Sequence, residues 1–150
     1  MSLQDKVMAE MKAAMKAKDS AKLEALRAVK SAILLANTES DSKDGLSEEE
    51  ELKLLQKLVK QRKESAQIYQ EQGREDLAAP ELEQALVIES FLPEQLSEEE
   101  VEAKVEEVIA KTGASGMQDM GKVMGMVTKE LAGRADGRTI STIVKRKLSN

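Results

Sequence analysis

The sequence predicts an all-α protein, with an N-terminal four-helix unit followed by a C-terminal three-helix unit. The strong helix formers Leu, Ala, Met, Glu and Lys dominate the 150 residues, and only Pro80 and Pro93 interrupt them. Tyr69 and Phe91 are the only aromatic residues. No stretch alternates apolar and polar residues in the way that a half-buried strand does. The chain is long enough to bury a core, although each half alone would be marginal.

The first two helices are separated by residues that favour a helix start. The first is expected over about residues 3–16, with an apolar stripe formed by Leu3, Val7, Met11 and Met15. Asp19 and Ser20 are capping residues, so they should begin a second helix that ends near Asn37. Its expected buried residues are Leu23, Leu26, Val29 and Ile33. Residues 38–45 form a loop by composition, with Asp44–Gly45 as its turn.

The third helix begins with a capping box. The Ser47 hydroxyl can accept a backbone N–H of the first turn, while the Glu50 carboxylate reaches back to the N–H of Ser47. The helix should run to about Gln72 and stop at Gly73. Its expected core stripe is Leu52, Leu55, Val59, Ala66 and Tyr69.

The fourth helix is expected to begin near Arg74, with Pro80 in its first turn, where proline is tolerated. Its expected buried residues are Leu82, Leu86 and Phe91. Pro93 disfavours helix at Leu92, so the sequence predicts a boundary there. The expected units are residues 1–93 and 94–150.

Three further helices are expected after Pro93. Ser97 with Glu100 forms a second capping box for a helix that ends at Gly113, and Ser115 with Gln118 forms a third box. The sixth helix has an apolar stripe at helical spacing, made of Met120, Val123, Met124, Val127 and Leu131. Asp136 should cap the last helix, whose expected inner face is Ile140, Ile143, Val144 and Leu148.

Composition excludes several kinds of chemistry. The chain has no Cys and no His, which excludes disulfides, zinc sites and Ser-His-Asp or Cys-His catalysis. The acidic run Glu48–Glu51 suits the first turn of a helix better than a metal, because consecutive side chains point apart. No apolar run approaches the ~20 residues that span a bilayer, and the first residues are too polar for a signal peptide. We therefore expect a soluble cytoplasmic protein without metal or cofactor.

Charge is distributed unevenly along the chain. From Lys111 onward there are eight basic and three acidic residues, whereas the whole chain has a net charge of −5. Such a contrast favours nucleic acid or another acidic partner for the basic end. Ordinary solvated helix faces would explain it equally well.

The loop 133–138 places Arg134 and Arg138 beside the expected start of the last helix. Backbone N–H groups at a helix start favour anions, and Arg suits bidentate phosphate contact. The alternative is a plain connector with Asp136 as its cap. Lys145, Arg146 and Lys147 are adjacent in sequence, so they point around the last helix and cannot all face one ligand.

Gly121 and Gly125 lie four residues apart within the sixth helix, where each glycine costs about 1 kcal/mol relative to Ala. This spacing indicates that another backbone comes close, either from the fifth or seventh helix or from an RNA or protein partner. The methionines of this region can be core residues or an adaptable binding groove. Met126 is the one expected to be most exposed.

Four stretches resemble the GatB/YqeY family, and in particular its small stand-alone YqeY-like proteins. They begin at Leu26, Leu54, Phe91 and Met120 and read LRAVKSAI, LLQKLVKQRKESAQIYQEQGREDL, FLPEQLSEEE and MGKVMGMVTKELAGRADGRTISTIVKRKL. Together they cover nearly the whole chain. The resemblance implies a two-part helical fold of bacterial type, related to the tail of the GatB subunit of glutamine-dependent tRNA amidotransferase.

In that enzyme the helical tail engages tRNA while the chemistry lies in other domains. The family-level activity is that of a carbon–nitrogen ligase with glutamine as amido donor. This chain matches only the tail, and it has neither a phosphate-cradling P-loop nor a Cys- or Ser-based amidase signature. We therefore expect a module that is not catalytic by itself, and we assign no catalytic residue.

The first functional hypothesis is a tRNA-binding module that uses the C-terminal unit. Its expected phosphate contacts are Lys122, Lys129, Arg134, Arg138, Lys145 and Arg146. The second is an adaptor that docks an amidotransferase subunit or another protein against Gly121, Gly125 and Met126. Amidotransferase activity of the chain alone is a third. We expect no DNA and no membrane as partners.

Overall fold

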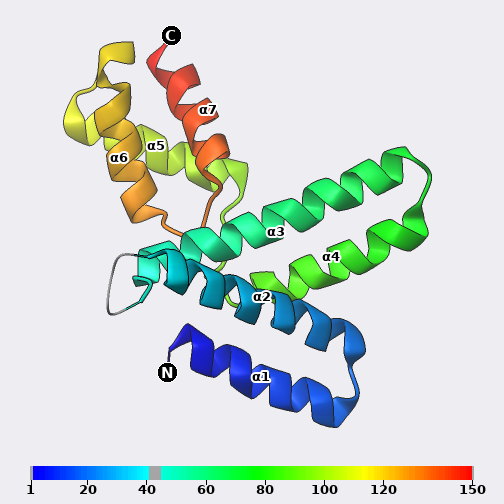
Figure 1. Ribbon diagram of the computed structural model, residues 1–150. Helices are drawn as coiled ribbons and strands as arrows, with labels where there is room; N and C mark the ends of the chain where they lie inside the picture. The colour runs from blue at the N-terminus through cyan, green and yellow to red at the C-terminus, as the bar shows by residue number, and fades with distance from the viewer. Residues whose placement is uncertain (1, 41–44, 150) are drawn as a thin grey trace. The chain divides into compact units, whose positions relative to one another are not determined.

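The computed structural model describes residues 2–40 and 45–149. These residues form seven α-helices and one short 3-10 helix, with no strand among them (Figure 1). The prediction of an all-α fold with four helices followed by three is confirmed. The chain divides into two compact units, Met1–Leu92 and Pro93–Asn150, which are described separately.

The first unit contains two helical hairpins. Helices α1 (Leu3–Ala17) and α2 (Ser20–Glu39) form one, and α3 (Glu48–Glu71) and α4 (Glu75–Glu89) form the other (Figure 1). The two hairpins meet mainly where α2 packs against α4.

Local hydrogen bonds explain where these helices begin. Ser47 Oγ accepts the Glu50 N–H at 3.2 Å, and Glu50 Oε2 accepts the Ser47 N–H at 2.9 Å, so the predicted capping box is confirmed. Asp19 Oδ1 accepts a first-turn N–H of α2, also as predicted. Gly73 follows α3 with a φ of 72°, a conformation that favours glycine. The turn predicted at Asp44–Gly45 lies partly outside the described residues.

The core of the first unit follows the predicted stripe of α2 but not that of α1. Its buried members are Val7, Ala14, Leu26, Val29, Ile33, Leu55, Leu58, Val59, Ala85 and Ile88. Met15, predicted to be buried, is 53% exposed, and Ala14 takes its place at 2%. α1 packs against α2 alone among the larger helix contacts, and the small Ala14 lets their ends approach.

The predicted inner face of α4 is wrong. Leu82 and Leu86 are 38% and 68% exposed, whereas Ala78, Ala85 and Ile88 are buried. Both sets have helical spacing, so periodicity alone does not choose between them; the alanines allow the closer packing. Pro80 lies inside α4, beyond the first turn where the sequence analysis placed it. Phe91 packs partly buried against the core, as predicted.

The second unit contains α5 (Glu98–Thr112), the 3-10 helix η1 (Met117–Asp119), α6 (Met120–Glu130) and α7 (Gly137–Leu148). The three α-helices pack against one another in pairs. Their core is mostly β-branched: Val101, Val105, Val108, Val123, Val127, Leu131, Ala135, Ile140, Ile143, Val144 and Leu148. The predicted inner face of α7 is confirmed in full.

Two predicted caps in this unit are wrong. The Ser115–Gln118 box does not form, because Gly116 is extended (φ −165°) and the chain then makes the η1 turn. The Ser115 N–H donates instead to Asp119 Oδ2 at 3.1 Å. Asp136 occupies the N-cap position of α7, but its side chain makes no capping hydrogen bond. The predicted Ser97–Glu100 box is present.

Candidate functional site

Lys122 and Lys129 lie on the solvent-facing side of α6. They are two helical turns apart, which brings both side chains to one face at about 10.5 Å spacing along the axis. Val123 and Val127 occupy the buried side of the same helix. Both lysines are exposed, and neither has an ion-pair partner in the part of the chain that the structure describes.

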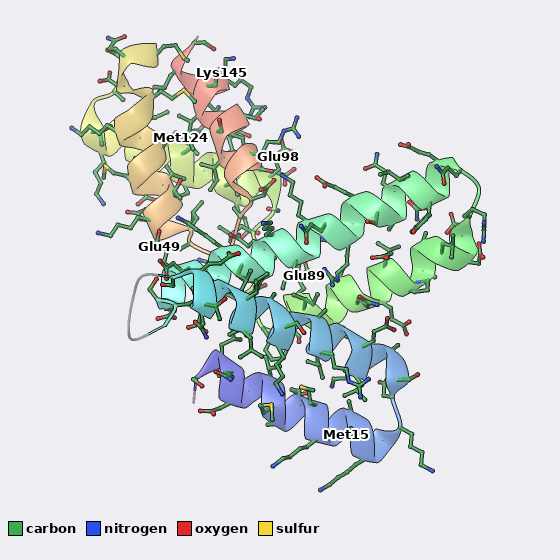
Figure 2. The ribbon with its side chains drawn as sticks, viewed as in Figure 1. Met15, Glu49, Glu89, Glu98, Met124 and Lys145 are labelled. Atoms are coloured by element: carbon green, nitrogen blue, oxygen red, sulfur yellow. The ribbon has the colours of Figure 1, made fainter. Side chains whose placement is uncertain are left out.

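Arg138 and Lys145 repeat this arrangement on α7. They too are two turns apart, while Ile140, Ile143 and Val144 face the core. Both cations are exposed and lack a carboxylate partner within residues 2–40 and 45–149. Figure 2 labels Lys145 on α7 and Met124 on the neighbouring α6. Each of the two helices therefore carries a pair of unneutralised cations on its outer side.

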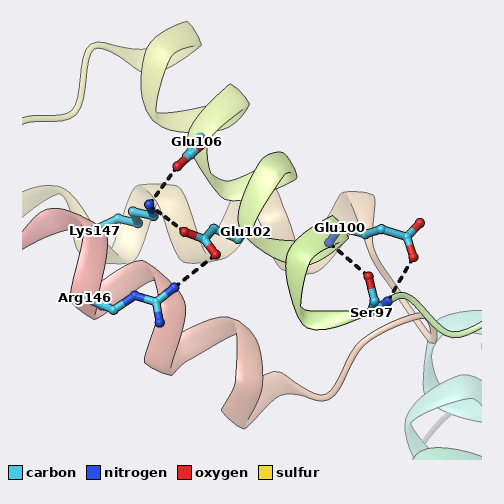
Figure 3. Close-up of polar contacts among 6 residues, drawn as sticks. All are labelled: Ser97, Glu100, Glu102, Glu106, Arg146 and Lys147. Carbon is cyan, nitrogen blue, oxygen red and sulfur yellow. Dashed lines mark hydrogen bonds and ion pairs between the residues drawn. The ribbon is translucent and has the colours of Figure 1, made fainter.

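Arg146 and Lys147 have a different environment, because they face α5 (Figure 3). Lys147 Nζ lies 2.7 Å from both Glu102 Oε1 and Glu106 Oε1, and Arg146 Nη2 lies 3.3 Å from Glu102 Oε2. Hydrogen bonding to Glu102 and Glu106 raises the pKa of Lys147, and the same bond from Lys147 lowers the pKa of Glu102. Arg146 must leave this network to contact a phosphate.

A similar bridge joins α5 to α6. Lys104 Nζ lies 3.3 Å from Glu107 Oε2 and 3.4 Å from Glu130 Oε2. Hydrogen bonds to Glu107 and then Glu130 raise the pKa of Lys104. The acidic residues of α5 thus neutralise cations at its borders with both neighbouring helices. The sequence analysis missed this screening, because its partners lie far apart along the chain.

Arg134 holds the segment that leads into α5. Its Nε donates to the Glu94 carbonyl at 3.3 Å, and its own carbonyl accepts the Leu96 N–H at 2.9 Å. Gln95 Nε2 adds a 2.6 Å hydrogen bond to the Gly133 carbonyl. These bonds leave the two terminal nitrogens of the Arg134 guanidinium without a partner among the described residues. Arg134 therefore has a structural task, and part of its guanidinium stays available to an anion.

The three residues expected to contact a partner differ in exposure. Gly121 and Gly125 are exposed, and a Cβ built on either would meet nothing within 4 Å. The close approach of α5 or α7 that the sequence analysis considered is therefore absent. Met126 is partly buried against the core, so the prediction that it is the most exposed methionine of the region is wrong. Met117, at 43%, is more exposed.

A hollow of about 320 Å³ lies in the first unit, beside the starts of α1 and α3. Lys6, Glu51 and Phe91 are among its lining residues. Burial is the main cause that raises the pKa of Glu51. No group of three or more acidic side chains among the described residues is arranged to hold a metal ion. Within the same residues, no helix has the length and apolar character to cross a membrane.

The comparisons with known proteins agree with the motifs. The family described as Yqey-like protein matches residues 4–148. One component of the Glutamyl-tRNA(Gln) amidotransferase of Thermococcus gammatolerans is 44% identical over 73 residues, which cover 46% of this chain and 12% of that protein. The chain thus spans a small part of that relative's length. Because the family match extends over nearly all its residues, the chain belongs to the YqeY-like family.

Proposed function

We propose that the chain is a tRNA-interacting helical module that binds through the outer sides of α6 and α7. The observation that carries the proposal is the pair of unneutralised cations on each helix: Lys122 with Lys129, and Arg138 with Lys145. The relative from Thermococcus gammatolerans is named for a tRNA substrate, which supports RNA as the partner.

The contacts would position a phosphate backbone and read little sequence. Lys and Arg side chains supply phosphate contacts, whereas base stacking needs aromatic side chains. The only aromatic residues, Tyr69 and Phe91, lie in the first unit. Arg134 offers its terminal nitrogens as a further contact, and Arg146 contributes only when its pair with Glu102 opens. Affinity should therefore depend steeply on salt and weakly on RNA sequence.

The module acts by binding, and its amidotransferase resemblance reflects shared ancestry with a larger enzyme's tail. The family-level label of carbon–nitrogen ligase with glutamine as amido donor would then describe the larger enzyme. The second candidate is an adaptor that docks a protein helix on α6. The open space above Gly121 and Gly125 favours it, since bare backbone permits close helix approach.

The test measures binding of the full chain to a labelled tRNA transcript across a salt series. We expect affinity to fall as salt rises, with a log–log slope of about −0.7 to −0.9 for each phosphate contacted. The double variant Lys122→Glu/Lys129→Glu should weaken binding at least about tenfold and flatten this slope.

The matched control is Lys12→Glu/Lys16→Glu on α1. These lysines are equally exposed and unpaired in the described chain, but they belong to the first unit. The control changes net charge by the same amount, so a nonspecific charge effect would weaken both variants alike. Equal loss in both, or no binding at low salt, would reject the proposed face. A protein partner that stays bound after nuclease treatment, and is lost in Gly125→Leu, would favour the adaptor.

A further inference from the structure

The outer face of α4 carries an apolar stripe that nothing in the first unit covers. Ala79, Leu82 and Leu86 are spaced by three and four residues, so they lie on one side of the helix. Leu86 is 68% exposed and Leu82 is 38% exposed. The core of the unit holds other residues of α4, Ala85 and Ile88. The helix is therefore apolar on two sides, of which only one is buried.

The charges beside this stripe have one sign. Helix α4 contains five acidic residues and no basic residue. Asp76 is paired with Arg74, and Glu89 lies 3.2 Å from Lys63. Glu75 and Glu83 are exposed and have no cationic partner among the residues described. Helical spacing places Glu75 in line with the stripe and Glu83 at its edge.

We propose that this face of α4 is the docking surface for a basic amphipathic helix of a partner protein. Helices that lie in an apolar groove or against an apolar face contact it at i, i+3 or i+4, and i+7, which is the spacing of Ala79, Leu82 and Leu86. Lysines or arginines that border the partner's apolar stripe would meet Glu75 and Glu83. Opposite charges at the rim select the partner and raise its association rate.

Charge also decides against two other occupants. In a two-fold contact between copies of this chain, the same surface would face itself, so Glu75 and Glu83 would approach acidic residues. An RNA backbone is repelled for the same reason. The docking surface belongs to the first unit and the proposed RNA face to the second, so either proposal can fail without the other.

The test uses the full chain and three fluorescent synthetic peptides. The first is a helix-forming peptide with a leucine stripe and lysines on its remaining positions. The second replaces each lysine by glutamate, and the third scrambles the first to remove the stripe. Fluorescence anisotropy measures the affinity of each peptide. We expect the basic amphipathic peptide to bind at least about tenfold more tightly than either of the others.

Two variants of the chain locate the binding. Leu82→Ser/Leu86→Ser should lower the affinity for the basic peptide about tenfold or more, because the buried leucine contacts are lost. Leu35→Ser is the matched control: Leu35 is 61% exposed on α2, and its replacement should leave the affinity unchanged. Glu75→Gln/Glu83→Gln should weaken binding and reduce its salt dependence.

Three results would overturn the proposal. Equal binding of the basic and scrambled peptides would show that the apolar stripe is not recognised. Equal affinities of the wild type and Leu82→Ser/Leu86→Ser would place the peptide elsewhere. Concentration-dependent self-association that Leu86→Ser abolishes would assign the face to a second copy. Circular dichroism of each variant checks that the helices are intact, which we expect because both leucines are exposed.

Discussion

At the scale of single residues, neighbours in the sequence have opposite environments. Lys145 is exposed and unpaired in the described chain, whereas Arg146 and Lys147 bind carboxylates of α5. Exposed ion pairs contribute little stability, so the main effect of this network is on the availability of charge. An anion that approaches α7 meets Lys145 first and competes with Glu102 for Arg146. The phosphate-binding role is therefore argued most strongly for Lys145.

A capping residue offers a clear test at this scale, because the sequence contains one box that forms and one that does not. Ser97 Oγ accepts the Glu100 N–H at 3.2 Å, and Glu100 Oε1 accepts the Ser97 N–H at 3.1 Å (Figure 3). We expect Ser97→Ala to lower the free energy of unfolding of the second unit by about 1 kcal/mol. Urea denaturation followed by circular dichroism measures the change.

Ser115→Ala is the control for this prediction. Ser115 stands in the same sequence pattern, but its side chain makes no capping bond, and the extended Gly116 separates it from η1. Its replacement should change stability by less than about 0.5 kcal/mol. If both serines cost the same, the local sequence pattern and not the observed hydrogen bonds would determine the stability.

At the scale of helices, sequence reasoning succeeded where one face alone is apolar. The periodicity of α2 and α7 identifies a single stripe, and the buried residues Leu26, Ile33 and Ile140 lie on it. In α4 two apolar faces share the helical period. Alanines at the buried contact let α4 pack closely, and this choice depends on the shape of α3 and α2. No local pattern in the sequence contains that information.

The candidate site shows the same limit. Helical spacing alone places Lys122 with Lys129 and Arg138 with Lys145, so these pairs could be predicted. The hydrogen bond from Arg134 to Glu94 and the pairing of Arg146 with Glu102 could not. They join residues about forty positions apart, and only the packing of the helices brings such residues together.

The glycines of α6 yield a prediction about one element. Gly125 lies inside a helix, its φ is not positive, and an added Cβ would meet no atom within 4 Å. Gly125→Ala should therefore raise the free energy of unfolding by about 0.5–1 kcal/mol, since glycine loses more conformational freedom on folding. The contrasting variant is Gly113→Ala at the end of α5, where φ is 70° and the left-handed conformation should cost about 1 kcal/mol. Thermal unfolding of both variants measures the two shifts, and a loss of stability in Gly125→Ala would contradict the assigned environment.

At the scale of the whole molecule, the chain contains two separate hydrophobic cores. One is formed by residues of α1 to α4, and the other by residues of α5 to α7 together with Ala135. The two proposed surfaces follow this division, with an acidic apolar face on α4 and basic faces on α6 and α7. A chain of this kind could hold an RNA and a protein at the same time, each on its own unit.

Independent unfolding of the two units is the prediction that belongs to this scale. Tyr69 is the chain's only tyrosine and lies in the first unit, so its fluorescence reports on that unit alone, whereas circular dichroism reports on both. Ile143→Val should destabilise the second unit by about 0.5–1.5 kcal/mol and move only the dichroism transition. Leu26→Ala, in the other core, should move the Tyr69 transition. If Ile143→Val shifts both signals equally, the chain unfolds as one cooperative body, and the two cores stabilise each other.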